Sequence, residues 1–202
     1  MTMTTNDLAA FLAHANEAVQ RQEQRLNAAD AKLGDGDTGS MLRRVLSAMV
    51  AVDVEGAAGL SEAATALAQA AMKETGSSLG TLVATAAMTF AKEARAAGNT
   101  LTADDTGRIV SAMRDAVASR GRAAIGDKTV VDSLDAIAEA LNARPATLAI
   151  AAEAAAHALD TFRDRPCKIG RARMFPQKST GADDPGMLAM VLLLAQRPQA
   201  EI

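Results

Sequence analysis

Three aspartates around a glycine-rich turn are the residues of this sequence best suited to chemistry. Asp30, Asp35 and Asp37 fall within eight residues, and the segment 34–40 that holds the last two reads GDGDTGS. Glycines let the backbone fold back and bring side chains to a common point. Carboxylates this close repel one another, and the usual relief is a divalent cation bound through oxygen, with phosphates at its remaining positions. The sequence therefore predicts a magnesium site that also holds nucleotide phosphate.

A simpler reading of the acidic turn is that each aspartate caps a helix by accepting backbone N–H groups. Three aspartates together, beside glycines and just before a helix, favour the metal instead. The helix that follows the turn presents free N–H groups and about half a positive charge at its first residues. Phosphate is therefore expected between the metal and this helix N-terminus.

Three familiar motifs are matched only in part. Gly34, Gly36 and Gly39 have the spacing of the dinucleotide fingerprint, but no hydrophobic strand precedes them. The segment 121–129 is one residue longer than a Walker A loop and also lacks a strand. A calcium-binding EF-hand loop counted from Asp35 would need glycine and glutamate where Ser40 and Leu46 stand. None of these motifs accounts for the turn.

Helices are expected to position the site. Aromatic residues are 2% of the chain, alanine is abundant, and no segment alternates apolar and polar residues as a strand would. We predict an all-α fold of eight helices, with Ser61 as the N-cap of the third. Asp184 and Pro185 suit the N-cap and first position of the last helix. The one long irregular stretch is Arg163–Asp183, which is rich in basic residues.

Length and composition predict one domain over residues 1–202, because a chain with 49% apolar residues buries a single sizeable core. The net charge of -3 and the scattered arginines argue against a nucleic-acid partner. The longest apolar run, Met187–Ala195, is too short to span a membrane. The lone Cys167 and a polar N-terminus favour a cytoplasmic location.

Five motifs in order resemble a known family. They are Asp30 with the segment 34–39, Gly76-Ser77-Ser78, Ser119-Arg120-Gly121 with Gly126-Asp127-Lys128-Thr129, Gly170-Arg171-Ala172 and Asp184-Pro185-Gly186. The chain resembles, over essentially its whole length, the nucleotide-binding L subunit of dihydroxyacetone kinases or their equivalent C-terminal domain. Each motif is weak alone, but their order and spacing are specific.

The resemblance implies an eight-helix antiparallel barrel whose loops hold the nucleotide at one end. It implies Mg²⁺ on Asp30, Asp35 and Asp37, bridging to the phosphates of ADP or ATP, and Arg171 as the catalytic contact to the terminal phosphate oxygens. The positions it places near the nucleotide are Thr38, Gly39, Ser40, Met41, Ser77, Ser78, Gly121, Thr129, Arg171, Asp184, Pro185 and Gly186.

The same resemblance implies a second, substrate-binding kinase subunit that holds a short-chain ketose. Some members of the family use ATP, whereas others keep ADP that a phosphotransferase-system protein rephosphorylates. The absence of an obvious base for the substrate hydroxyl fits a site that another subunit completes. The sequence leaves open the acceptor, the phosphoryl donor and whether the chain forms a homo-oligomer.

The chain departs from the family at four positions: Thr38 and Ala182 replace usual histidines, Met41 replaces an asparagine, and Leu79 replaces a glycine. Its DGDTG turn is similar to that of the fatty acid kinase ATP-binding domain, so an acyl-phosphate-forming kinase is the alternative enzyme. A helical regulatory protein that binds a partner through the basic stretch 163–178 is the non-enzymatic alternative.

Overall fold

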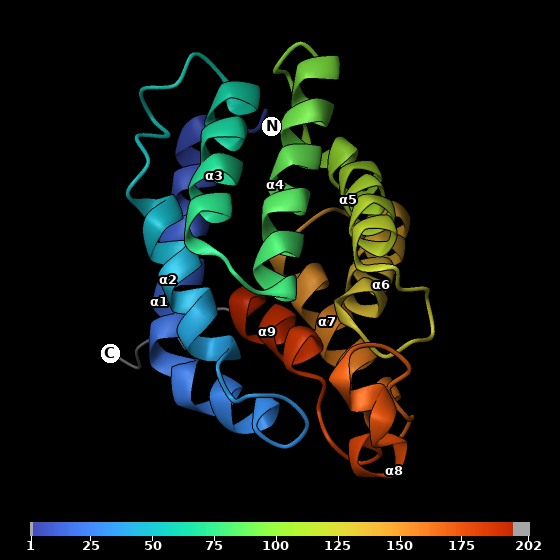
Figure 1. Cartoon of the computed structure of the whole chain (residues 1–202). Helices are drawn as coiled ribbons and strands as arrows, with labels where there is room; N and C mark the ends of the chain where they lie inside the picture. Colours follow the sequence, from blue (N-terminus) through green and yellow to red (C-terminus); the bar gives the residue numbers. More distant parts are fainter. Residues whose placement is uncertain (1, 196–202) are drawn as a thin grey trace, which may run out of the picture.

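Helices build the part of the chain that the computed structural model describes, residues 2–195 (Figure 1). Their bounds are α1 Thr5–Asp30, α2 Thr38–Val50, α3 Leu60–Glu74, α4 Ser78–Ala96, α5 Thr106–Gly121, α6 Val130–Ala143, α7 Leu148–Arg163, α8 Pro176–Ser179 and α9 Pro185–Leu194. Two short 3₁₀ turns, η1 Ala103–Asp105 and η2 Arg171–Met174, complete the set. No strand occurs in residues 2–195, where the only pairing of this kind is an isolated bridge between Thr2 and Thr102.

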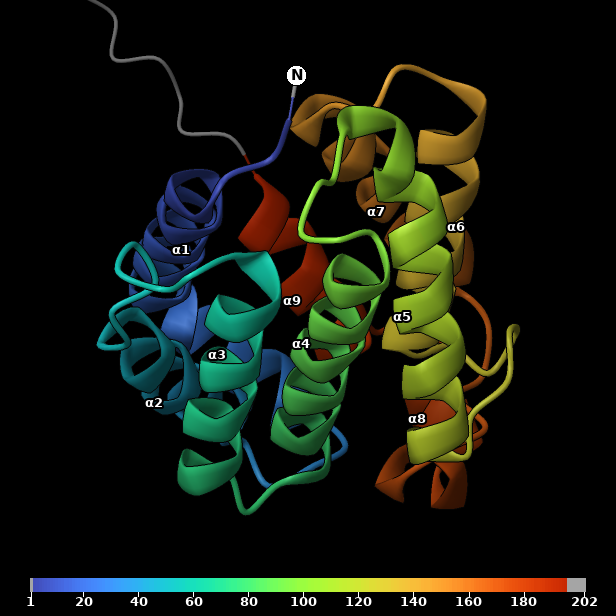
Figure 2. The ribbon, with the colours of Figure 1, turned by 90° about the horizontal axis from the view of Figure 1, so that it is seen from above.

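The eight long helices form a ring. Each of α1 to α6 packs against the next helix, and α9 packs against both α7 and α1 and so closes the ring (Figure 2). The prediction of an all-α fold with eight helices is confirmed for the long elements. The stretch predicted to be irregular, between α7 and α9, also contains η2 and the single-turn helix α8.

Successive helices alternate in direction, which sorts their connections between two ends of the ring (Figure 1). The segments 31–37, 75–77, 122–129 and 164–184 gather at one end, which we call the loop end. The other three connections lie at the opposite end, together with the first residues of the chain. This arrangement brings the motifs of the sequence together, because all five lie in or beside loop-end connections.

The last helix, α9, is apolar on all its faces and lies in the main core cluster. Met187 is fully buried and packs in one cluster with Val19 and Leu26 of α1, which are also fully buried. Full burial of one such side chain stabilises the fold by about 1.5–3 kcal/mol. Among the described residues, none of the helices combines the length and the apolar character that crossing a membrane requires.

Two helix starts can be compared with the predicted N-caps. Asp184 caps α9, with its carboxylate accepting the Met187 N–H at 2.9 Å, as predicted. The prediction of Ser61 as N-cap is wrong: the N-cap of α3 is Gly59, and Ser61 is buried in the first turn. Its N–H donates to Asn99 at 2.9 Å, so a residue of the neighbouring loop replaces the side-chain cap.

Candidate functional site

The loop end encloses a cleft of about 630 Å³, which all four loop-end connections line. One wall is the acidic turn with the start of α2, and a second is the turn at Gly76, Ser77 and Ser78. The third wall is Lys128 and Thr129 with the segment from Cys167 to Pro185. A volume of this size falls in the range of small-molecule and cofactor sites, about 300–1,000 Å³.

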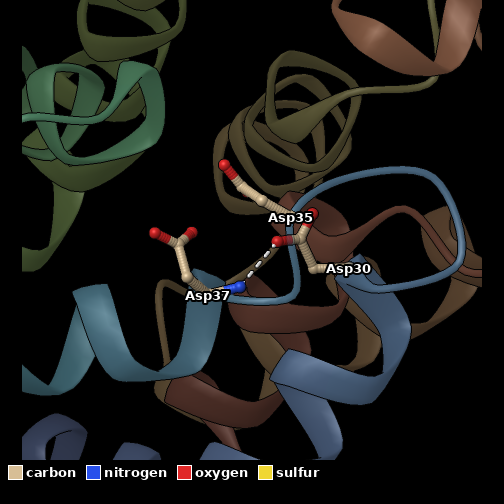
Figure 3. A group of neighbouring side chains, drawn as sticks. All are labelled: Asp30, Asp35 and Asp37. Carbon is tan, nitrogen blue, oxygen red and sulfur yellow. Dashed lines mark hydrogen bonds between the residues drawn. The ribbon is translucent and has the colours of Figure 1, made fainter.

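The three aspartates of the acidic turn converge as the sequence predicts. Asp30 is the last residue of α1, Asp37 precedes the first residue of α2, and Asp35 lies in the turn between them (Figure 3). One carboxylate oxygen from each lies within 4.8 Å of the others. Asp30 is half-buried, whereas Asp35 and Asp37 are exposed. The cluster offers hard oxygen ligands of the kind that Mg²⁺ prefers.

Asp30 and Asp37 differ in their contacts with the backbone of the turn. Asp37 is the N-cap residue of α2, yet its side chain makes no capping hydrogen bond. Asp30 accepts the N–H group of Gly36 at 3.0 Å. It also accepts the N–H group of Asp37 at 3.0 Å (Figure 3). Gly36 has a φ of 78°, in the left-handed region that glycine adopts without steric cost. The carboxylate of Asp30 therefore folds the turn back on itself.

The N-terminus of α2 differs from the expectation. Asn27 of α1 accepts the N–H groups of Gly39 at 2.7 Å and Ser40 at 3.1 Å. The Met41 N–H donates within the helix, to the Asp37 carbonyl. The predicted phosphate contact through these amides is therefore corrected: Asn27 satisfies two of the donors that a helix N-terminus leaves without intrahelical partners.

Gly39 and Ser40 serve the contact between α1 and α2. A β-carbon on Gly39 would meet the Glu23 carbonyl oxygen and the Asn27 side chain, so only glycine lets the two helices approach here. The Ser40 hydroxyl accepts from the Asn27 amide at 3.0 Å and donates to Glu23 at 2.9 Å. Glu23 also pairs with Arg43 of α2 at 3.0 Å. This network fixes where α2 begins.

The second wall is the start of α4. Ser77 is its N-cap, and the Ser77 hydroxyl accepts the Gly80 N–H at 3.1 Å. The Thr75 hydroxyl receives the Ser77 N–H at 3.2 Å, which closes the turn. Ser78 and Leu79 also line the cleft. The wall therefore combines hydroxyls with an apolar side chain, a surface suited to a ligand with polar and apolar parts.

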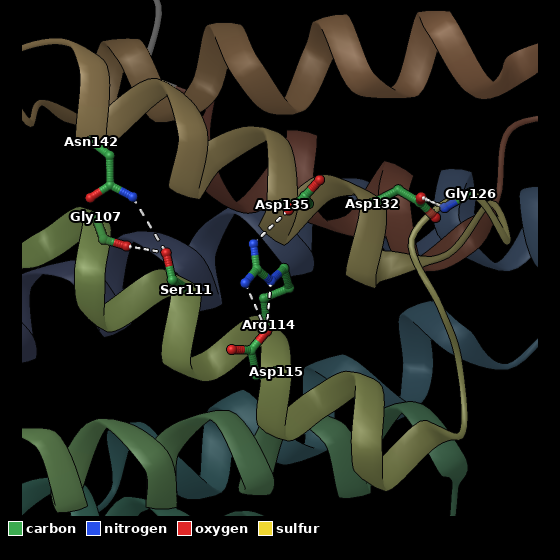
Figure 4. Close-up of polar contacts among 8 residues, drawn as sticks. All are labelled: Gly107, Ser111, Arg114, Asp115, Gly126, Asp132, Asp135 and Asn142. Atoms are coloured by element: carbon green, nitrogen blue, oxygen red, sulfur yellow. Dashed lines mark hydrogen bonds and ion pairs between the residues drawn. The ribbon is translucent and has the colours of Figure 1, made fainter.

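The loop that carries Lys128 and Thr129 is held by the pairing of α5 with α6 (Figure 4). Arg114 of α5 bonds Asp135 of α6 at 2.6 Å. At the end of the loop, Asp132 accepts the N–H groups of Gly126 at 2.5 Å and Thr129 at 2.7 Å. Asp132 is buried, and desolvation raises the pKa of its carboxyl despite these bonds. Loop and helix thus form one unit.

Asp184, on the third wall, has a carboxyl whose pKa is strongly raised. Desolvation raises the pKa of its carboxyl to about 6, against the N–H groups of Met187 and Gly186 and the charge of Lys128, which lower it. Burial likewise raises the pKa of the Cys167 thiol. A thiol of this kind is a poor nucleophile.

Most of the residues predicted near the ligand line the cleft. They are Asp30, Asp35, Asp37, Thr38, Met41, Ser77, Ser78, Thr129, Asp184 and Pro185. Four others are not among its lining residues: Gly39 and Ser40 face α1, Gly121 packs beside Leu82, and Gly186 packs against Val130. Arg171 begins η2 between lining residues Gly170 and Ala172, and its side chain lies outside the described residues.

Sequence reasoning missed three residues that shape the site. Arg44 lines the cleft, and its place one turn after Met41 on α2 is a spacing signal that could have revealed it. Lys128 was part of a quoted motif but had no assigned role. Asn27 gave no signal, because its partners lie 12 and 13 residues away in the chain and only the fold brings them together.

Comparison with known proteins supplies the remaining evidence. The family model of the DAK2 domain matches residues 32–197. The chain is 29% identical, over 91% of each sequence, to the PTS-dependent dihydroxyacetone kinase, ADP-binding subunit DhaL, of Lactococcus lactis subsp. lactis (strain IL1403). It is 32% identical to the L-erythrulose kinase of Pectobacterium atrosepticum, over 93% of this chain and 33% of that protein.

Solved structures share the fold. The dihydroxyacetone kinase of C. freundii in its native form has a TM-score of 0.74 and 21% identity, over 92% of this chain and 33% of that one. The complex of the C. freundii kinase with AMP-PNP and Mg²⁺ has a TM-score of 0.72 and 21% identity, over 96% of this chain and 34% of that one. The chain therefore spans about one third of the C. freundii kinase.

Proposed function

This chain belongs to the DAK2 domain family, and on that basis we propose that it is the nucleotide-binding subunit of a kinase for a short-chain ketose. In this proposal it binds ADP or ATP with Mg²⁺ and transfers phosphate to a hydroxyl of dihydroxyacetone or a related ketose. A separate subunit holds that ketose. The names of the relatives, ADP-binding subunit and L-erythrulose kinase, support the nucleotide and the class of acceptor.

The observation that carries the proposal is the set of three carboxylates within 4.8 Å on the wall of a cleft large enough for a nucleotide. Their chemistry fits Mg²⁺, because three carboxylates offer hard oxygen ligands at one point and leave room for phosphate oxygens. When bound, the metal supplies charge neutralisation on the phosphates. Asp30, Asp35 and Asp37 are the residues that would hold it.

The chain's own groups orient the nucleotide around this point. Asp30 holds the turn closed through the Gly36 and Asp37 amides, so the ligand positions exist before the cation arrives. Thr38 and the hydroxyls of Ser77 and Ser78 present polar contacts in the same cleft. Fixed groups of this kind lower a barrier by positioning reactants rather than by covalent catalysis.

Two basic residues are assigned to the phosphates. Arg44 lines the cleft, and a guanidinium donates hydrogen bonds to phosphate in a fixed geometry. Arg171 keeps its predicted role at the terminal phosphate oxygens, since its neighbours Gly170 and Ala172 line the same cleft. None of the described residues that line the cleft is a histidine that could act as a base, which supports a second subunit as the source of the substrate's proton acceptor.

The donor and the remaining partner are part of the proposal. One relative, matched over 91% of its own length, carries the words PTS-dependent in its name, which supports a phosphotransferase-system protein that recharges bound ADP. The alternative of a fatty-acid-kinase-like enzyme gains no support from the relatives described above, which are named for ketoses. A cytoplasmic location belongs to the same proposal and rests on the single, buried Cys167.

Thermal unfolding of the purified chain tests the proposal. Ligand at a hundred times its dissociation constant adds about 2.7 kcal/mol, which raises the midpoint by roughly 5–10 °C for a domain of this size. We expect the shift with ADP or ATP only when Mg²⁺ is present, and its loss in excess chelator.

Variants of the acidic turn sharpen this test. Asp35→Asn and Asp37→Asn should each abolish the shift without changing the helical circular dichroism. Asp104→Asn, an exposed carboxylate in the connection between α4 and α5, should leave it intact. Normal nucleotide binding by both turn variants would refute the metal assignment.

A further inference from the structure

Lys128 is the most deeply buried charged residue in the described part of the chain, with 1% of its surface exposed. Its Nζ donates to the carbonyl oxygens of Arg163 at 2.7 Å, Arg165 at 2.9 Å and Ser179 at 2.7 Å. A lysine ammonium has three protons, so these bonds use all of them. Lys128 borders the cleft, yet it keeps no donor for a phosphate.

The three carbonyls come from the two ends of one segment. Arg163 is the last residue of α7, Arg165 follows two residues later, and Ser179 is the last residue of α8. Carbonyls at a helix C-terminus lack intrahelical partners and carry partial negative charge, so a buried cation is well placed there. One side chain from the connection 122–129 thus joins both ends of the segment 165–179.

Cys167 and Ser179 form further hydrogen bonds beside the ammonium. We call Lys128, Cys167 and Ser179 the lysine node. The Cys167 N–H donates to the Ser179 hydroxyl at 2.9 Å, and this hydroxyl donates to the Pro176 carbonyl at 2.7 Å. Cys167 and Ser179 are also buried, with 6% and 1% exposed. All three residues line the cleft, so the node forms part of its third wall.

The backbone conformation of Lys128 is unfavourable for a lysine. Its φ of 61° lies in the left-handed region, which favours glycine or asparagine over residues such as lysine. Burial lowers the pKa of the ammonium, whereas the charge of Asp184 and the three carbonyls act in the opposite direction. The left-handed backbone and the burial of the charge both cost free energy. The three hydrogen bonds of the ammonium offset these costs and give a reason for a lysine at this position.

We propose that Lys128 is a positioning residue, which holds the segment 164–184 in place as the third wall of the nucleotide cleft and does not contact phosphate. This inference rests on the proposed function for the ligand. The clamp, by which we mean the three hydrogen bonds from the Lys128 ammonium to the carbonyl groups, rests only on the contacts above. The residues that the clamp places include Asp184 and the Gly170–Ala172 stretch that carries Arg171. Without it, the wall and its groups would lose their fixed position relative to the acidic turn.

Hydrogen exchange of the nucleotide-free chain tests the clamp directly. Lys128→Met keeps the length of the side chain and removes the donors, so amides of the segment 164–184 should exchange about tenfold faster or more, with other helices unchanged. The matched control is Lys178→Met in the same segment, where the lysine is exposed and lies over the Phe175 ring. A second variant, Lys128→Asn, suits the left-handed backbone and is too short to reach the carbonyls.

Nucleotide affinity is the second measurement, made by calorimetry with Mg²⁺ and ADP below the unfolding temperature. Both Lys128 variants should weaken binding about tenfold or more, and Lys178→Met should not. Unchanged exchange in both Lys128 variants, or faster exchange spread over every helix, would overturn the clamp. Faster local exchange with unchanged affinity would overturn its role in the site. Failure of the unmodified chain to bind ADP would instead reject the proposed function, and the exchange result would still decide the clamp.

Discussion

Replacing Asn27 with alanine should both destabilise the fold and weaken the site, although Asn27 does not line the cleft. The carboxamide accepts the N–H groups of Gly39 and Ser40 and donates to the Ser40 hydroxyl. Alanine would leave two donors at the start of α2 without these partners. The first turn of α2 would then loosen, and Asp37, which precedes the helix, and Thr38, its first residue, would lose their fixed position.

The expected magnitude follows from the number of bonds lost. Removing a side chain that caps a helix N-terminus costs about 0.5–2 kcal/mol. A second half-buried donor left without a partner adds about 1 kcal/mol. We therefore expect a loss of about 1.5–3 kcal/mol, which lowers the unfolding midpoint of a domain of this size by roughly 3–12 °C.

The assay is thermal unfolding of Asn27→Ala beside Asn16→Ala, with and without Mg²⁺ and ADP. Asn16 also joins α1 to α2, through a single exposed hydrogen bond from Ser47 at 3.3 Å, so its loss should cost about 0.5 kcal/mol or less. We expect Asn27→Ala to show the larger loss and a smaller nucleotide-induced shift. Equal midpoints for the two variants would refute the assignment of Asn27 as the residue that fixes the start of α2.

Three further predictions concern single residues. Gly39→Ala should lower the unfolding midpoint by several degrees, from about 1–3 kcal/mol of overpacking against α1, whereas Gly76→Ala, whose β-carbon meets no atom within 4 Å, should not. The raised pKa of Asp184, about 6 against 3.8, means that the folded chain holds a proton which the unfolded chain releases. Urea unfolding of the unliganded chain should therefore show stability falling as pH rises from about 4 to 6, with that contribution absent in Asp184→Asn. Arg44→Gln should weaken ADP binding about tenfold in calorimetry, whereas Arg25→Gln on exposed α1 surface should leave it unchanged.

The fold was predictable because its signals are local. Helical spacing of apolar residues, and Asp184 followed by Pro185, depend only on neighbours along the chain. The wrong assignment of Ser61 arose because Asn99 reaches across from another loop and takes the role that a capping side chain would have. A sequence does not display such a partner. The short helix α8 escaped prediction for a related reason, since contacts with Lys128 and Cys167 hold its last residue.

The sequence indicated that the acidic turn and the hydroxyl turn would lie in one candidate site, because carboxylates and hydroxyls beside glycines are typical of metal and phosphate sites, and both turns line the cleft. The groups that hold the walls of the site were not predictable, since Asn27 and Lys128 act on backbone atoms far away in the chain. Asparagine and lysine are common on helix and loop surfaces, so their types gave no warning of a buried or bridging role. For the same reason, the N–H groups at the start of α2 were expected to be open to phosphate, whereas Asn27 accepts those of Gly39 and Ser40.

The charges on the cleft walls give a reason why nucleotide and cation should bind together. The described side chains that line the cleft include the carboxylates of Asp30, Asp35, Asp37, Asp183 and Asp184. The basic side chains among them are Arg44 and Lys128, and the Lys128 ammonium donates its three hydrogen bonds to carbonyl groups. Phosphates entering this cleft alone would meet repulsion, and a cation alone would lack the phosphate oxygens that complete its shell. Each ligand therefore improves the site for the other, and linkage requires that Mg²⁺ raise the affinity for ADP by the same factor as ADP raises that for Mg²⁺.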